Sequence, residues 1–101
     1  MIKPAQDRIA ISQLRAGDRC DQVFLVYSRE LRQTKAGKYY IRAVLQDSSG
    51  QIDAVLWDAS ESIAADMPSE SFIQAQVRVE QYQGTLQMVI ESFRPTEAAS
   101  Q

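Results

Sequence analysis

The chain has 101 residues, enough for one domain with a single hydrophobic core. Apolar residues make up 45% and charged residues 24% of the sequence, which is typical of a globular protein and excludes a disordered one. No apolar run approaches the roughly 20 residues that span a bilayer, so no membrane partner is expected. The opening MIKPAQDRIAIS lacks the apolar centre of a signal peptide, and the single cysteine, Cys20, cannot form an internal disulfide. We therefore expect a reducing, cytoplasmic location.

The absence of histidine from the sequence excludes much catalytic chemistry. Without an imidazole there is no Ser–His or Cys–His nucleophile pair, no histidine base titrating near neutral pH and no histidine metal ligand. A magnesium site built from carboxylates alone stays open, but the 13 acidic residues form no tight cluster along the chain. We therefore expect a protein that is not an enzyme, with no catalytic residue, no metal and no cofactor.

The formal net charge of −2 hides an uneven distribution of charge. The segment 29–42 carries a charge of +4, and the remaining residues together carry −6. Such a chain attracts a polyanion to one place and repels it elsewhere. The five bases of this segment are Arg29, Arg32, Lys35, Lys38 and Arg42.

The first predicted elements are a lead-in and a long strand. Residues 1–16 form the lead-in, in which Ser12 caps a short helical turn that ends at Gly17. Residues 20–31 (CDQVFLVYSREL) follow as a strand whose apolar residues do not alternate cleanly. This pattern predicts a strand that is buried on both faces or that bends between two sheets. The next segment, RQTKAGK, is a flexible and basic connection.

Residues 38–57 (KYYIRAVLQDSSGQIDAVLW) predict a hairpin, because apolar and polar positions alternate on both sides of the turn DSSG. Pairing the two strands through this turn fixes their register and brings both apolar sets, including Tyr39, to one face. Tyr40, Arg42 and Trp57 then share the outer face. Two aromatic side chains on the outside of a soluble domain indicate a binding surface.

A short helix and two more strands complete the predicted domain. Residues 58–68 (DASESIAADMP) predict the helix, with Asp58 and Glu61 as a capping box and Pro68 as its end. Alternating strands follow at 72–82 and 85–93, and residues 95–101 are a polar tail or a truncated linker. Five strands with one helix between the third and the fourth are typical of the OB-fold, a Greek-key barrel. We therefore predict an all-β OB-fold domain at 17–94.

The segments GDRCDQVFLVYSRELRQTKAGKYYIRAVLQDSSGQIDAVLWD and VRVEQYQGTLQMVI resemble a known family. They resemble the OB domain that opens bacterial 3′-to-5′ exoribonucleases carrying an HD phosphohydrolase domain. They are similar, more distantly, to the OB anticodon-binding domains of class II aminoacyl-tRNA synthetases. The resemblance implies RNA or single-stranded DNA lying across the second and third strands, near the loop of Lys35 and Lys38 and the loop of Tyr82 and Gln83. The HD domain is missing from this sequence, so nuclease activity is not assigned to it.

These observations predict non-catalytic binding of single-stranded nucleic acid, with RNA favoured and DNA not excluded. Bases stack on exposed aromatic rings, and basic side chains hold the phosphates. In a longer chain the domain would present RNA to a downstream HD nuclease domain. The predicted nucleic-acid-binding residues are Arg32, Lys35, Lys38, Tyr40, Arg42, Asp53, Trp57 and Tyr82.

Other interpretations stay open on the sequence alone. One is that Trp57 packs under the helix, and another is that Arg42 forms a plain ion pair with Asp53 across the hairpin. A different class of function is a protein-interaction or oligomerisation module, in which Trp57, Val55 and Val44 form an apolar patch. The sequence indicates no particular oligomeric state.

Overall fold

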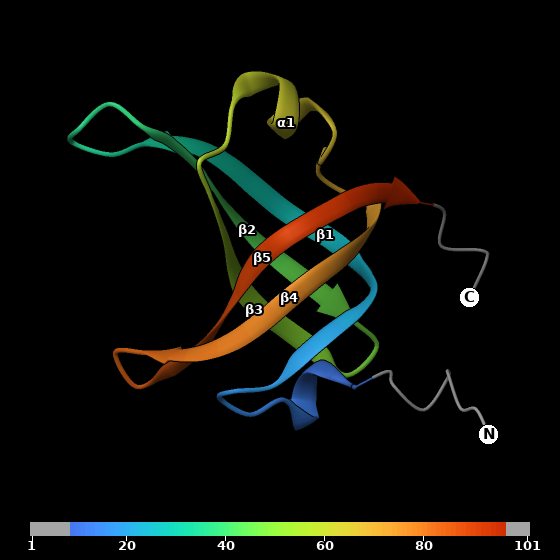
Figure 1. The fold of residues 1–101 in the computed structure, drawn as a ribbon. Coiled ribbons are helices and arrows are strands. Elements are labelled where there is room, and N and C mark those ends of the chain that lie inside the picture. Colours follow the sequence, from blue (N-terminus) through green and yellow to red (C-terminus); the bar gives the residue numbers. More distant parts are fainter. Residues whose placement is uncertain (1–8, 97–101) are drawn as a thin grey trace.

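The computed structural model describes residues 9–96, whose five strands close into a barrel (Figure 1). Neighbouring strands follow the order β1-β2-β3-β5-β4, and all pairs are antiparallel except β3 with β5. A short helix, α1, lies between β3 and β4 in the chain. This is the predicted OB-fold, which the structure confirms. The elements are the 3-10 helix η2 (Ile11–Gln13), β1 (Arg19–Gln33), β2 (Tyr39–Asp47), β3 (Gly50–Trp57), α1 (Glu61–Ala65), β4 (Phe72–Tyr82) and β5 (Thr85–Thr96).

Strand β1 serves both sides of the barrel, as its lack of alternation predicted. It pairs with β4 from Arg19 to Leu25 and with β2 from Leu25 to Gln33. The register with β2 shifts between Val26 and Ser28, which leaves Tyr27 without a partner at a β-bulge. A bulge bends the strand and increases its twist, so that one strand can turn from one neighbour to the other.

The hydrophobic core is formed by the inward sets of the strands. Its largest fully buried side chains come from β1, β2, β4 and β5 and from Met67 after α1. Tyr39, which we expected in the inward set, is instead 39% exposed, so that prediction was wrong. It is the first residue of β2 and lies opposite Gln33, the last residue of β1. At the end of a strand pair the inward direction no longer leads into the packed interior.

The lead-in is attached to the barrel by the turn between β2 and β3. The Ile11 amide donates to Asp47 Oδ2 (2.9 Å), and the Ser12 amide donates to Ser49 Oγ (3.0 Å). We expected Ser12 to cap this helix, and that prediction was wrong. The first amides of η2 instead find their acceptors on this distant turn. Ile11 and Leu14 belong to the core cluster.

The ends of the predicted domain remain a prediction. In the structure β5 continues through Thr96, beyond the expected end at residue 94. Residues 1–8 of the lead-in and 97–101 of the tail lie outside the described residues.

Helix α1 begins at a different cap from the one we expected. Ser60 is its N-cap, and its side-chain oxygen accepts a hydrogen bond from the Ile63 amide (3.2 Å). Asp58 lies two residues earlier with a φ of 60°, so the predicted capping box of Asp58 and Glu61 is not formed. Asp and Asn tolerate this left-handed conformation better than most residues do, which suits Asp58 to the bend between β3 and α1.

The change Ser60→Ala is expected to lower the free energy of unfolding by about 1 kcal/mol, because the Ile63 amide loses its acceptor. Asp58→Asn, which keeps a residue tolerant of positive φ, is the matched control and should change stability by less than about 0.5 kcal/mol. Urea denaturation of the three proteins measures both values. A larger loss in Asp58→Asn than in Ser60→Ala would contradict the assignment of Ser60 as the N-cap.

Candidate nucleic-acid interface

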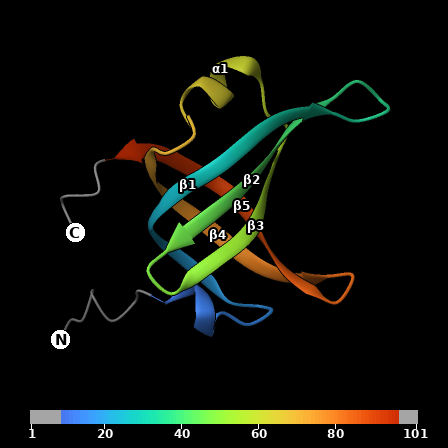
Figure 2. The same ribbon diagram turned by 180° about the vertical axis from the view of Figure 1, so that it is seen from behind.

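A groove lies between the outer face of the β2–β3 hairpin and the β4–β5 hairpin. The β1–β2 and β4–β5 connections extend from the same side of the barrel, as both views show (Figures 1 and 2). The groove has a volume of about 630 Å³ and is lined by residues of β2, β3, β4 and β5 and of the turn between the last two strands. Three aromatic rings line it: Tyr40, Trp57 and Tyr82.

Tyr40 and Trp57 form an aromatic pair at one end of the groove. They are direct partners in the β2–β3 register, which the short turn at Asp47–Gly50 sets. Their ring centroids lie 5.1 Å apart with an interplanar angle of 37°. Trp57 is 51% exposed, so it is not packed under α1. A large, rigid and open aromatic surface is what a base can stack on.

Arg42 lies in the next row of the same outer face. Its register partner is Val55, while Asp53 is opposite Val44, so the arginine and the aspartate are not direct cross-strand partners. Within residues 9–96 no ion pair joins Arg42 to Asp53. The Arg42 guanidinium is therefore available to a phosphate or to the face of a base.

Val55 forms part of the floor of the groove and is only 4% exposed. Val44 is half-buried. Of the apolar patch required by a protein-interaction module, the exposed part is therefore the Trp57 indole. That alternative stays a prediction.

The other predicted basic residues do not line the groove and lie in or next to the β1–β2 connection. Lys35 and Lys38 are exposed in the β1–β2 connection, whose tight turn is closed by the Thr34 amide donating to the Lys38 carbonyl (2.8 Å). Arg32 is opposite Tyr40 in the β1–β2 register and donates to Glu30 Oε1 (2.8 Å). The hydrogen bond to Glu30 raises the pKa of the Arg32 guanidinium above its ordinary value. Arg32, Tyr40 and Trp57 thus form one row across three strands.

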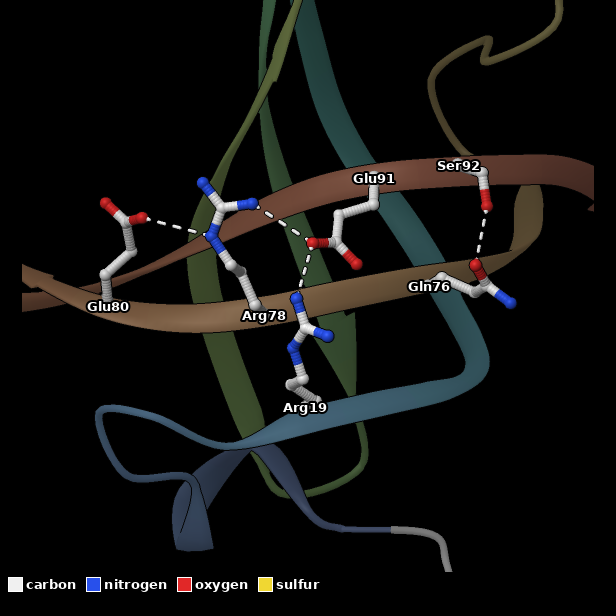
Figure 3. Close-up of polar contacts among 6 residues, drawn as sticks. All are labelled: Arg19, Gln76, Arg78, Glu80, Glu91 and Ser92. Atoms are coloured by element: carbon white, nitrogen blue, oxygen red, sulfur yellow. Dashed lines mark hydrogen bonds and ion pairs between the residues drawn. The ribbon is translucent and has the colours of Figure 1, made fainter.

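Arg19 on β1 and Arg78 on β4 are differently placed, because carboxylates already pair with them (Figure 3). Glu91 Oε2 accepts from Arg19 (2.9 Å) and from Arg78 (3.1 Å), and Arg78 also contacts Glu80 at 3.4 Å. Among residues 9–96 no ion pair engages Lys35, Lys38 or Arg42. These are three of the six arginine and lysine side chains in this range that no ion pair engages; the other three are Arg15, Arg29 and Arg94. The β1–β2 connection and the β2–β3 face thus carry a local excess of positive charge.

Sequence reasoning missed some of the polar residues that line the groove. Gln87 and Glu80 looked like ordinary outward residues of their strands, and both line the groove. They reach it because β3 and β5 pair in parallel, with Asp53 opposite Gln87, and because Gln87 is opposite Glu80 in β4. A pairing between strands so far apart in the chain leaves no local pattern. Assuming the strand order of the OB-fold would have brought Gln87 beside the β2–β3 face.

Cys20 and the acidic residues provide little for catalysis in the described part of the chain. Burial raises the pKa of the Cys20 thiol to about 11, with smaller contributions from Asp18 and Asp21, so the thiol stays protonated and a poor nucleophile. No group of three or more His, Cys, Asp or Glu within residues 9–96 could hold a metal ion. No helix in this range is long and apolar enough to cross a membrane.

A closed five-stranded barrel with an aromatic groove across β2 and β3 defines an OB-fold binding module. The family described as "OB-fold nucleic acid binding domain" matches residues 25–96, and the chain belongs to this family. The match spans the bulge of β1, the groove and all the strands that follow.

Several curated relatives are exoribonucleases. The chain is 32% identical over 79 residues to "3'-5' exoribonuclease YhaM" of Bacillus subtilis (strain 168), and the alignment covers 78% of this chain and 25% of the relative. The protein of the same name from Halalkalibacterium halodurans is 31% identical over 85 residues, covering 84% and 27% of the two chains. The chain thus spans about a quarter of the length of these relatives.

Solved structures share the fold at lower identity. The second OB-fold domain of replication protein A from Methanococcus maripaludis has a TM-score of 0.65 and 18% identity, covering 88% of this chain and 94% of that one. Asparaginyl-tRNA synthetase from Pyrococcus horikoshii has a TM-score of 0.70 and 19% identity, covering 97% and 23%. The predicted resemblance to bacterial 3′-to-5′ exoribonucleases, and more distantly to aminoacyl-tRNA synthetases, is confirmed.

Proposed function

We propose that this domain binds single-stranded nucleic acid, with RNA favoured, along the outer face of β2 and β3 and performs no chemistry on it. The observation that carries the proposal is the Tyr40–Trp57 pair in the groove, in which Trp57 is exposed and Tyr40 is half-buried. Stacking of a base on such a ring stabilises binding by about 1–3 kcal/mol and depends little on which base is present. The preference for RNA is supported by the names of the relatives.

The phosphates of the bound strand are held by Arg42, Lys35 and Lys38. These side chains have no ion-pair partner among the described residues, so no internal contact has to break before a phosphate binds. Few phosphates are neutralised in this way, and the rest of the chain is acidic. Binding is therefore weak, with a Kd of about 1 µM or higher, and sensitive to salt.

In the longer relatives the corresponding region would present RNA to a separate nuclease domain. That domain is expected to be an HD domain located after it in the chain. The expected location of this activity is the cytoplasm. This role is supported by the relatives, which are named exoribonucleases although the matched region covers only 25% of their length. A binding module that holds the strand raises the local concentration of RNA at a catalytic domain attached to it.

A salt titration tests the proposal. We expect a fluorescent oligouridine of about twelve nucleotides to bind more weakly as salt rises from about 50 to 200 mM, with a slope of log K against log salt near −0.7 for each phosphate contacted. The double change Lys35→Gln and Lys38→Gln removes two contacts and should flatten the slope by about 1.4. Fluorescence anisotropy measures both.

The matched control is the double change Arg15→Gln and Arg94→Gln, which removes the same charge from outside the groove. It should leave the slope close to that of the parent protein, because neither arginine lines the groove and the slope reflects the number of phosphates contacted. Absence of binding to any single strand, or binding indifferent to salt, would overturn the proposed function. Equal slopes in the two double variants would overturn the role given to Lys35 and Lys38.

A further inference from the structure

A second row of side chains crosses the groove beyond the Tyr40–Trp57 pair. Asp53 on β3 is the register partner of Gln87 on β5, and Gln87 is the partner of Glu80 on β4. All three residues line the groove. Asp53 precedes Trp57 by four residues on the same face of β3, which places the two rows about 13 Å apart along the strand.

The polar groups of this row differ in how far they are already engaged. Glu80 contacts the Arg78 guanidinium at 3.4 Å. Within residues 9–96, by contrast, no hydrogen bond or ion pair engages the Asp53 carboxylate, and no hydrogen bond engages the Gln87 carboxamide. A carboxylate and an amide thus lie side by side and available in the groove.

An aromatic ring lies next to this row. Tyr82 follows Glu80 by two residues on the same face of β4, also lines the groove and is 57% exposed. The groove therefore offers a second position at which a base can stack, and at this position the edge of the base meets polar side chains. A carboxylate repels a phosphate, so the base edge and not the backbone must face Asp53.

The four RNA bases differ in what they offer to a carboxylate. Guanine alone carries two adjacent donors on its Watson–Crick edge, N1–H and the N2 amino group, and these match the two oxygens of one carboxylate. Its O6 lies beside N1 and accepts from an amide nitrogen such as Gln87 Nε2. Uracil presents one N–H between two carbonyl oxygens, and both of these are repelled by a carboxylate.

We propose that Asp53 and Gln87 form a guanine-reading subsite: Asp53 accepts from N1 and N2, Gln87 donates to O6, and Tyr82 stacks on the ring. The inference rests on the proposed function and adds a base preference to a surface that otherwise binds by stacking. This role explains why the acidic side chain of Asp53 lies in a groove that binds nucleic acid: it selects against strands that lack guanine at this position.

The test compares oligouridines of equal length that differ in one central nucleotide. Replacing one uridine by guanosine should tighten binding about tenfold, because a well-placed bidentate contact discriminates by this order. Inosine, which lacks the N2 amino group, should lose most of the gain. Asp53→Asn should abolish the gain and also bind plain oligouridine more tightly, since a repulsive charge is gone. Anisotropy at constant low salt measures all of these affinities.

Glu61→Gln is the matched control, because it removes the same charge from an exposed position on α1, outside the groove. It should keep the guanine preference of the parent protein. Equal affinity for the guanosine strand and plain oligouridine would overturn the subsite while leaving the stacking function intact. An undiminished guanine preference in Asp53→Asn would overturn the role of Asp53. Absence of binding to every strand would overturn the proposed function itself.

Discussion

Replacing Trp57 by alanine is expected to weaken binding of oligouridine by about 10- to 100-fold. The indole supplies one face of the aromatic pair with Tyr40, and the loss of one stacked base corresponds to about 1–3 kcal/mol. The side chain is 51% exposed at the end of β3, so the substitution removes a ring from the surface and opens no cavity in the core. The thermal unfolding midpoint should therefore change little while the Kd rises.

The matched control for this loss is Tyr27→Ala. Tyr27 is 55% exposed at the bulge of β1 and does not line the groove, so it tests whether any exposed aromatic ring promotes binding. Trp57 is the single tryptophan of the chain, and its fluorescence should be quenched when a base stacks on it. Binding that survives in Trp57→Ala, or that falls as far in Tyr27→Ala, would show that the strand lies elsewhere.

The hairpin that carries this surface could be predicted because all the information is local. Alternation on both sides of DSSG fixed which residues face outward, and the structure pairs Tyr40 with Trp57 through that turn. The bend of β1 could also be predicted, because apolar and polar residues do not alternate cleanly in a strand that changes partner. Both patterns can be recognised within about twenty consecutive residues of the sequence.

The features that sequence reasoning missed depend on contacts between distant segments. The amide of Ser12 bonds to Ser49, 37 residues away, so a local capping rule could not identify its acceptor. Gln87 enters the groove through the parallel pairing of β3 with β5. Tyr39 alternates correctly but lies where the barrel interior has already ended. In each case the deciding neighbour is set by the closure of the barrel and not by the adjacent sequence.

The turn at Asp47 contributes to both local and long-range structure. It sets the register of β2 with β3, and it also attaches the lead-in to the barrel. Asp47 Oδ1 accepts from the Ser49 amide (2.7 Å), the Ser49 hydroxyl (2.6 Å) and the Gly50 amide (3.2 Å), while Oδ2 accepts from the Ile11 amide (2.9 Å). One carboxylate thus holds the tip of the hairpin that carries the binding face and the N-terminal helix that covers part of the core.

The change Asp47→Ala is accordingly expected to lower the free energy of unfolding by about 2 kcal/mol at neutral pH, the order of a hydrogen-bonded charge that is partly exposed. Ser48→Ala in the same turn is the matched control, because Ser48 is exposed and no hydrogen bond engages its side chain among residues 9–96; it should cost less than about 0.5 kcal/mol. Urea denaturation measures both. Equal losses in the two variants would contradict the role of the carboxylate.

The contribution of Asp47 should also depend on pH. Burial alone would raise its pKa, but the hydrogen bonds from Ser49, Ile11 and Gly50 favour the charged form and hold the pKa below its ordinary value. As pH falls, the unfolded chain takes up the proton first, so the stabilisation is full above about pH 5 and is lost as pH drops through the lower pKa of the folded state. The stability difference between the parent protein and Asp47→Asn, which cannot titrate at this position, should therefore shrink between about pH 5 and pH 2. A difference that stays constant over this range would show that these hydrogen bonds do not favour the charged carboxylate.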